Sequence, residues 1–94
     1  MKIKRFRSGE AMTPEQCKMA RAGLGLGVRE LAERASVSTN TIARLEKGET
    51  LQPRTVYAIR TALESAGVEF IAENGGGPGV RLRKAGGMNP SEPR

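Results

Sequence analysis

The spacing of apolar and polar positions between residues 28 and 48 predicts two short helices joined by a tight turn. Six apolar or small residues stand where two crossing helices would meet: Leu31, Ala32, Ala35, Val37, Ile42 and Leu45. We expect Ala32 at the close crossing, because a larger side chain there would push the helices apart. The outward positions of the second helix hold short polar groups and one long cation: Ser38, Thr39, Asn40, Thr41 and Arg44. The pattern therefore predicts a polar helix face presented by an apolar helix pair.

A further helix is predicted before this pair. Thr13, Pro14 and Gln16 form a helix start, in which Thr13 caps, Pro14 fits the first helical position and Gln16 completes a capping box. We expect this helix to run to about Ala22 and to be broken by the glycine-rich linker 23–27. Its inward residues are predicted to be Cys17, Ala20 and Leu24, and its outward residues Glu15, Lys18 and Arg21.

The helix pair has clear end signals, and another helix follows it. The two helices are predicted over 28–35 and from about Thr39 to Leu45, with Ser38 as the N-cap and Gly48 as the C-terminal cap. After Pro53 the apolar residues repeat at three, four and three residues, as in an amphipathic helix ended by Gly67: Val56, Ile59, Leu63 and Ala66. Residues 12–67 are therefore predicted to form one helical domain.

Beyond Gly67 the apolar period changes from helical to alternating, which predicts a β-hairpin over residues 68–84 around the turn sequence NGGGPG. An isolated hairpin is marginally stable, so its apolar side either covers the chain's own helices or pairs with a second copy. The residues assigned to this dimerisation or packing surface are Val68, Phe70, Val80 and Leu82. Residues 85–94 are expected to form a flexible tail.

Composition favours a polyanionic partner and excludes much catalytic chemistry. The net charge is +6 and the sequence pI is near 10.3. His is absent and all ten acidic residues are Glu, so no Ser-His-Asp or Cys-His site can be built within one chain. With Cys17 as the sole cysteine, no thiol zinc site can be closed. We expect one small domain that is not an enzyme, needs no metal, cofactor or small-molecule ligand, and works in a reducing cytoplasm with no membrane span.

Residues 1–11 form a basic N-terminal arm, with four cations among the first seven residues: Lys2, Lys4, Arg5 and Arg7. Three alternatives stay open for it: an arm that follows a DNA backbone or enters a minor groove, a solvated terminus, or an edge strand carried by Ile3 and Phe6. Residues 12–66 hold eight Lys or Arg and six Glu, a net charge of +2. The helical domain alone is therefore only weakly basic.

Residues 13–66 resemble the phage-repressor (Cro/XRE-type) helix-turn-helix family, and ELAERASVSTNTIARLEKG is the most specific run. The apolar grid, the Ile-x-x-Leu-Glu-x-Gly ending and the Pro-led last helix occur together. The resemblance implies a mainly α fold: a four-to-five-helix repressor-like helix-turn-helix domain with a C-terminal β-hairpin. Ser36 departs from the family pattern, because glycine is usual at this left-handed turn position. We expect a turn strained by about 1 kcal/mol.

The family's mode of docking would place the third helix in the major groove of double-stranded DNA. Base readout is then expected from Thr39, Asn40 and Arg44, since Asn can pair with adenine and Arg with guanine. DNA backbone contacts are expected from Ser38, Thr41, Arg29, Lys47 and Arg54, with the arm residues Lys2, Lys4, Arg5 and Arg7 as additional candidates. The predicted function is a sequence-specific transcriptional regulator, a repressor that binds an inverted-repeat operator as a homodimer.

Two alternative classes involve a protein partner. The chain could be a DNA-binding antitoxin whose hairpin and tail bind its partner, or a protein-interaction adaptor that uses the helical fold without reading DNA. A co-purifying partner would indicate the first class. Lack of salt-dependent DNA binding would indicate the second.

Overall fold

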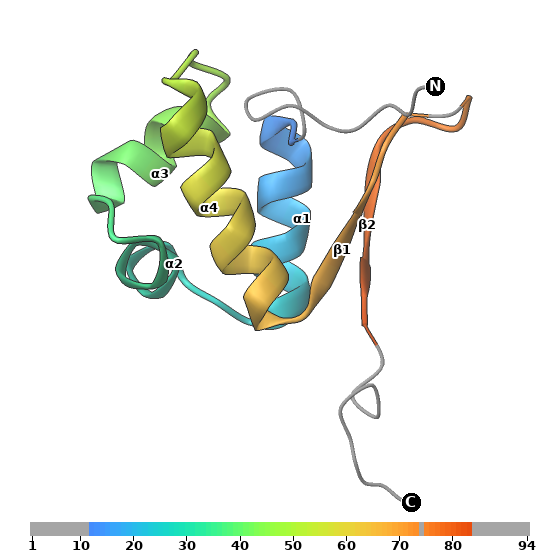
Figure 1. The fold of residues 1–94 in the computed structure, drawn as a ribbon, viewed down its shortest axis with the longest axis horizontal. Coiled ribbons are helices and arrows are strands. Elements are labelled where there is room, and N and C mark those ends of the chain that lie inside the picture. The colour runs from blue at the N-terminus through green and yellow to red at the C-terminus, as the bar shows by residue number, and fades with distance from the viewer. Residues whose placement is uncertain (1–11, 74, 84–94) are drawn as a thin grey trace, which may run out of the picture.

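The computed structural model describes residues 12–73 and 75–83. In chain order these residues form α1 (Pro14–Leu24), α2 (Val28–Ala35), α3 (Thr39–Glu46), α4 (Pro53–Ala66), β1 (Val68–Ile71) and β2 (Gly79–Leu82), arranged as in Figure 1. The prediction of a mainly α domain with a C-terminal hairpin is confirmed. The predicted basic arm, 1–11, and the predicted tail, 85–94, lie outside the described residues.

The predicted helix starts are made by the expected side chains. At α1, Thr13 Oγ1 accepts a hydrogen bond from the Gln16 backbone N–H at 3.0 Å, and Gln16 Oε1 accepts one from the Thr13 N–H at 2.8 Å. At α3, Ser38 Oγ accepts from the Thr41 N–H at 3.0 Å. These bonds satisfy amide groups that the first turn of a helix leaves without an intrahelical acceptor.

The prediction for the end of α1 is wrong by two residues. The helix continues through Gly23 to Leu24, and Gly25 ends it with φ +73°. The Gly25 and Leu26 N–H groups return to the carbonyls of Ala22 and Arg21 at 3.1 and 2.9 Å. The two added residues lie against the rest of the domain: Leu24 packs on the core, and Leu82 Cδ2 lies 3.5 Å from where a Cβ on Gly23 would stand.

Ser36 adopts the left-handed conformation expected at the turn between α2 and α3. Its φ is +60° and its ψ is +43°, and its N–H donates to the Glu33 carbonyl at 3.2 Å. The next N–H, of Val37, donates to the Ala32 carbonyl at 3.0 Å. The turn is thus a helix C-terminus that usually takes glycine, built here around a residue with a Cβ.

One apolar core joins the four helices and the hairpin. Leu31, Ile42, Ile59 and Leu63 are fully buried, as is Cys17, which confirms the inward assignment of these positions. The partly buried residues packed against this core include Leu24, Val37 and Phe70. Met12, to which no role was assigned, is also buried.

The hairpin covers the chain's own helices. β1 and β2 pair antiparallel with Val68 opposite Leu82 and Phe70 opposite Val80, and the hairpin packs on α1 and α4 (Figure 1). The assignment of Val68 to a dimer surface is therefore wrong, because this side chain is completely buried in its own domain. Phe70 and Val80 are partly buried against the core, whereas Leu82 is 52% exposed.

Gln16 attaches the far end of the hairpin to α1. Its Nε2 donates to the Ile71 carbonyl at 3.1 Å and to the Gly79 carbonyl at 2.8 Å, and these two residues face each other across the strands. The side chain is 2% exposed. One buried amide thus caps a helix with its oxygen and holds both strands with its nitrogen.

Candidate nucleic-acid interface

The candidate interface is the outward face of α3. Ile42 and Leu45, three residues apart, are buried and hold the helix on the core. Thr39 and Asn40 are exposed, and the Arg44 side chain is 43% exposed. Asn40 and Arg44 are four residues apart and therefore share one face of the helix. In Figure 1, α3 lies on the opposite side of the helical core from the hairpin.

The first turn of α3 is ordered by its own hydroxyl groups. The Ser38 and Thr41 hydroxyl oxygens are 2.9 Å apart and share a hydrogen bond, in addition to the bond from the Thr41 N–H to Ser38 Oγ. Both residues were assigned to DNA backbone contacts. Their hydroxyls primarily form the cap, and each oxygen keeps further hydrogen-bonding capacity toward a phosphate.

Arg44 has a partner that the sequence reasoning missed. Its Nε lies 2.8 Å from Glu49 Oε1, and the carboxylate side chain is 49% exposed. The signal was present in the predicted end of α3. Gly48 adopts φ +96°, and the Glu49 N–H turns back to the Arg44 carbonyl at 3.0 Å. A glycine that ends a helix in this way returns the next residue to the last turn.

The cations assigned to the DNA backbone come from three elements. Arg29 is in the first turn of α2, Lys47 follows the last residue of α3, and Arg54 is in the first turn of α4. All three are exposed. Within residues 12–73 and 75–83 no ion pair engages any of them. Their charges are available to an anionic ligand.

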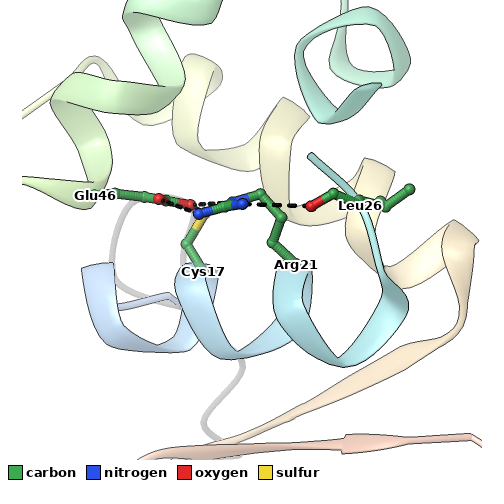
Figure 2. A network of polar contacts seen from close by, with 4 residues as sticks. All are labelled: Cys17, Arg21, Leu26 and Glu46. Carbon is green, nitrogen blue, oxygen red and sulfur yellow. Dashed lines mark hydrogen bonds and ion pairs between the residues drawn. The ribbon is translucent and has the colours of Figure 1, made fainter. Parts of the chain in front are cut away.

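A polar network beneath α3 fixes that helix to α1 (Figure 2). Arg21 donates from Nε to Glu46 Oε2 and from Nη2 to Glu46 Oε1, each at 2.8 Å, and from Nη1 to the Leu26 carbonyl at 3.3 Å. The Cys17 thiol lies 3.3 Å from Glu46 Oε2. Arg21 was expected to point outward, which is wrong. The guanidinium instead links α1, the loop before α2 and the last residue of α3.

The network shifts the pKa values of its members. Burial first, and then the hydrogen bond to Glu46, raise the pKa of the Cys17 thiol to about 12. Burial by itself would raise the pKa of the Glu46 carboxyl, but hydrogen bonds from Arg21 and Cys17 and the charge of Arg21 hold it below its usual value. The hydrogen bond to Glu46 raises the pKa of Arg21. At neutral pH the group is therefore an ion pair beside a neutral thiol.

The capped helix and the core beneath it define a class of protein, the helix-turn-helix DNA-binding domain. The helix-turn-helix family model matches residues 18–70, more than half of the 94-residue chain. The chain belongs to the Cro/C1-type helix-turn-helix family and is a DNA-binding regulator of the XRE type.

Domains of this family are regulatory and not typically enzymatic. A search of curated proteins finds no match to the chain. No helix within residues 12–73 and 75–83 has the length and apolar character needed to span a bilayer.

Proposed function

We propose that the chain is a sequence-specific repressor that inserts α3 into the major groove of an operator. The main support for this proposal is the outward face of α3, which presents Thr39, Asn40 and Arg44. The inner face of the same helix is buried, and its last residue is held by the Arg21–Glu46 ion pair. A rigid helix presenting short polar groups and one arginine suits the hydrogen-bond pattern of base edges.

In this proposal some side chains read DNA bases, and others contact the DNA backbone and position the protein. Asn40 pairs with adenine, Arg44 with guanine, and Thr39 offers its hydroxyl or methyl group to a neighbouring base. Ser38, Thr41, Arg29, Lys47 and Arg54 contact phosphates, with the arm residues Lys2, Lys4, Arg5 and Arg7 as further cations. The weak basicity of residues 12–66 supports a contribution from the arm to the affinity.

Selection of bound sequences from random duplex DNA by the full chain tests this function. We expect a selected site that contains an inverted repeat with half-sites about 10 base pairs apart, the spacing of two recognition helices on one face of the duplex. Arg44→Ala should weaken binding to the selected site at least about fivefold more than it weakens binding to random DNA. Lys47→Ala should weaken both and flatten the salt dependence. Equal loss on all sequences for Arg44→Ala would exclude this residue from base readout.

We further propose that the active species is a homodimer that represses by occluding a promoter in the cytoplasm. Leu82 supports this assignment as an exposed apolar side chain on the hairpin, and a free strand edge can pair with a second copy. Sedimentation equilibrium of the full chain and of Leu82→Lys tests the dimer. A wild-type monomer that still selects single half-sites would contradict it.

A protein partner is the second candidate function, as for an antitoxin or an adaptor. Two exposed apolar side chains favour it, Tyr57 on α4 and Leu82 on β2, at 54% and 52% exposure. Co-purification of one stoichiometric partner from the native cell, lost in both Tyr57→Lys and Leu82→Lys, would support this function. Salt-dependent DNA binding by the same complex would separate an antitoxin from an adaptor.

A further inference from the structure

Arg44 and Glu49 are joined through both backbone and side chain. The Glu49 N–H donates to the Arg44 carbonyl at 3.0 Å, and Arg44 Nε donates to Glu49 Oε1 at 2.8 Å. The backbone bond belongs to the helix end built around Gly48. The path of the backbone therefore places Glu49 beside Arg44. The ion pair does not depend on two unconstrained side chains meeting on the surface.

The contact occupies one edge of the guanidinium group. Arginine carries five N–H donors in a planar fork, and pairing with guanine O6 and N7 uses two of them. Because the carboxylate takes Nε, the two terminal nitrogens stay suited to a base. The Arg44 and Glu49 side chains remain 43% and 49% exposed, so a duplex can reach them.

The Arg44–Glu49 ion pair also lowers the net charge on the outward face of α3. Within α3, Arg44 is the cation and Glu46 the anion, and the charge of Glu46 is already balanced by Arg21. Glu49 balances Arg44 in turn. A neutral reading face attracts phosphates of any sequence less strongly than a cationic one.

We propose that Glu49 is a positioning residue for base readout, which orients Arg44 through Nε and cancels its attraction to phosphates of random DNA. Glu49 thereby lowers the affinity of the protein for DNA of any sequence and increases its discrimination between sequences. This inference rests on the proposed function, because it requires α3 to dock on base edges.

The experiment compares Glu49→Ala with a matched control, Glu69→Ala, using the full chain on the selected operator and on a random duplex. Glu69 pairs with Arg81 on the hairpin at 3.0 Å, so its removal deletes the same charge and frees an arginine away from α3. Glu49→Ala should bind random DNA about two- to fivefold more tightly, because the freed Arg44 cation can then neutralise up to about one phosphate. Its ratio of operator to random affinity should fall, and its salt dependence should steepen by up to about one ion. Glu69→Ala should keep the wild-type ratio.

Two further variants separate positioning from charge and from folding. Glu49→Gln keeps an oxygen for Arg44 Nε but loses the charge, so it should recover part of the preference for guanine and retain the steeper salt dependence. In an Arg44→Ala background, Glu49→Ala should no longer change the base preference. All variants should unfold at the same urea midpoint as Glu69→Ala, within error.

Two results would overturn the inference: a ratio of operator to random affinity for Glu49→Ala equal to that of Glu69→Ala, or a change of base preference by Glu49→Ala that persists without Arg44. Both require a wild-type protein that prefers its operator. A wild-type protein with no sequence preference would instead refute the proposed function, and the role of Glu49 in base readout with it.

Discussion

Arg21 and Glu46 form a bidentate ion pair that joins α1 to the last residue of α3, with both N–O distances at 2.8 Å. Their side chains are 24% and 10% exposed, so the pair is largely withdrawn from solvent. Charge-assisted bidentate contacts are stronger and more directional than neutral hydrogen bonds. Because Ile42 and Leu45 hold the same helix from its apolar side, α3 is fixed by packing and by charge together.

We expect Glu46→Gln to lower the free energy of unfolding by roughly 1–3 kcal/mol at pH 7, because it leaves the Arg21 guanidinium without its charged partner. Urea denaturation of the full chain measures the change. The matched control is Glu69→Gln, which removes the carboxylate of the exposed Arg81–Glu69 pair. That variant should lose less than about 1 kcal/mol. Equal losses in the two variants would contradict a special contribution from Glu46.

The same carboxylate should make the protein sensitive to acid. The pKa of Glu46 is lowered in the folded state from an ordinary value of 4.5, so its stabilisation is fully present above about pH 4.5 and is lost as pH falls through the folded pKa. Unfolding free energies measured from pH 7 down to pH 3 should therefore decline less steeply in Glu46→Gln than in the wild type. Parallel curves would show that the Glu46 carboxyl titrates alike in both states.

Cys17 should give the opposite pH dependence, at the alkaline end. Its thiol pKa rises from an ordinary value of 9.0 to about 12 in the folded state. The unfolded chain therefore releases this proton first, and stability that is complete below pH 9.0 is lost as pH rises toward about 12. The slope should reach at most about 1.4 kcal/mol per pH unit. Cys17→Ala should show a shallower loss between pH 8 and 10.5, and an unchanged slope would contradict the assignment.

Ser36→Gly should stabilise the domain by about 0.5–1 kcal/mol, since glycine relieves the strain of a left-handed residue but adds entropy to the unfolded chain. Gly25→Ala is the matched control. Gly25 also has a left-handed φ of +73°, and nothing lies within 4 Å of a Cβ built there. Its substitution should destabilise through the backbone alone, by about 1 kcal/mol. Thermal denaturation gives both changes, and a lower melting temperature for Ser36→Gly would contradict the expected relief of strain.

Gln16→Glu should loosen the hairpin while keeping the helix cap. A carboxylate still accepts from the Thr13 N–H but has no N–H for the Ile71 and Gly79 carbonyls. Because both bonds are only partly buried, each carbonyl that loses its donor costs about 1 kcal/mol, the low end of the range for a buried group. Amide hydrogen exchange at pH 7 should become faster in β1 and β2. Thr13→Ala, which removes the Thr13 side-chain cap of α1, should leave strand protection nearly intact, and equal strand protection in the two variants would contradict the role of the Gln16 amide.

The elements of the fold were predictable because their signals are local. Thr13, Ser38 and Gly67 act on backbone groups within a few residues of themselves, and the apolar repeats of α2 and α4 identify their buried faces. The left-handed backbone at Ser36 was predicted from the family resemblance, and its φ of +60° confirms it. The candidate base-reading face of α3 was predictable for the same reason, because Asn40 and Arg44 are four residues apart and therefore share a helix face.

Relations between distant residues were decided by the tertiary structure. Arg21 contacts Glu46 across 25 residues, and Gln16 contacts Ile71 and Gly79 across 55 and 63 residues. Residue spacing assigned Arg21 to the solvent side, because helical periodicity distinguishes faces but cannot identify what packs against them. Leu82 likewise lies over Gly23 from 59 residues away in the chain, a contact that helical spacing could not identify.

The sequence by itself therefore determined the helices, their caps and the polar surface of α3, because hydrogen bonds and periodicities over three to five residues specify them. Only the tertiary structure decided that Val68 is buried under its own helices, and that Arg21 and Glu46 hold α3 in place. Those outcomes depend on the packing of segments far apart in the chain, where burial gives polar contacts their strength.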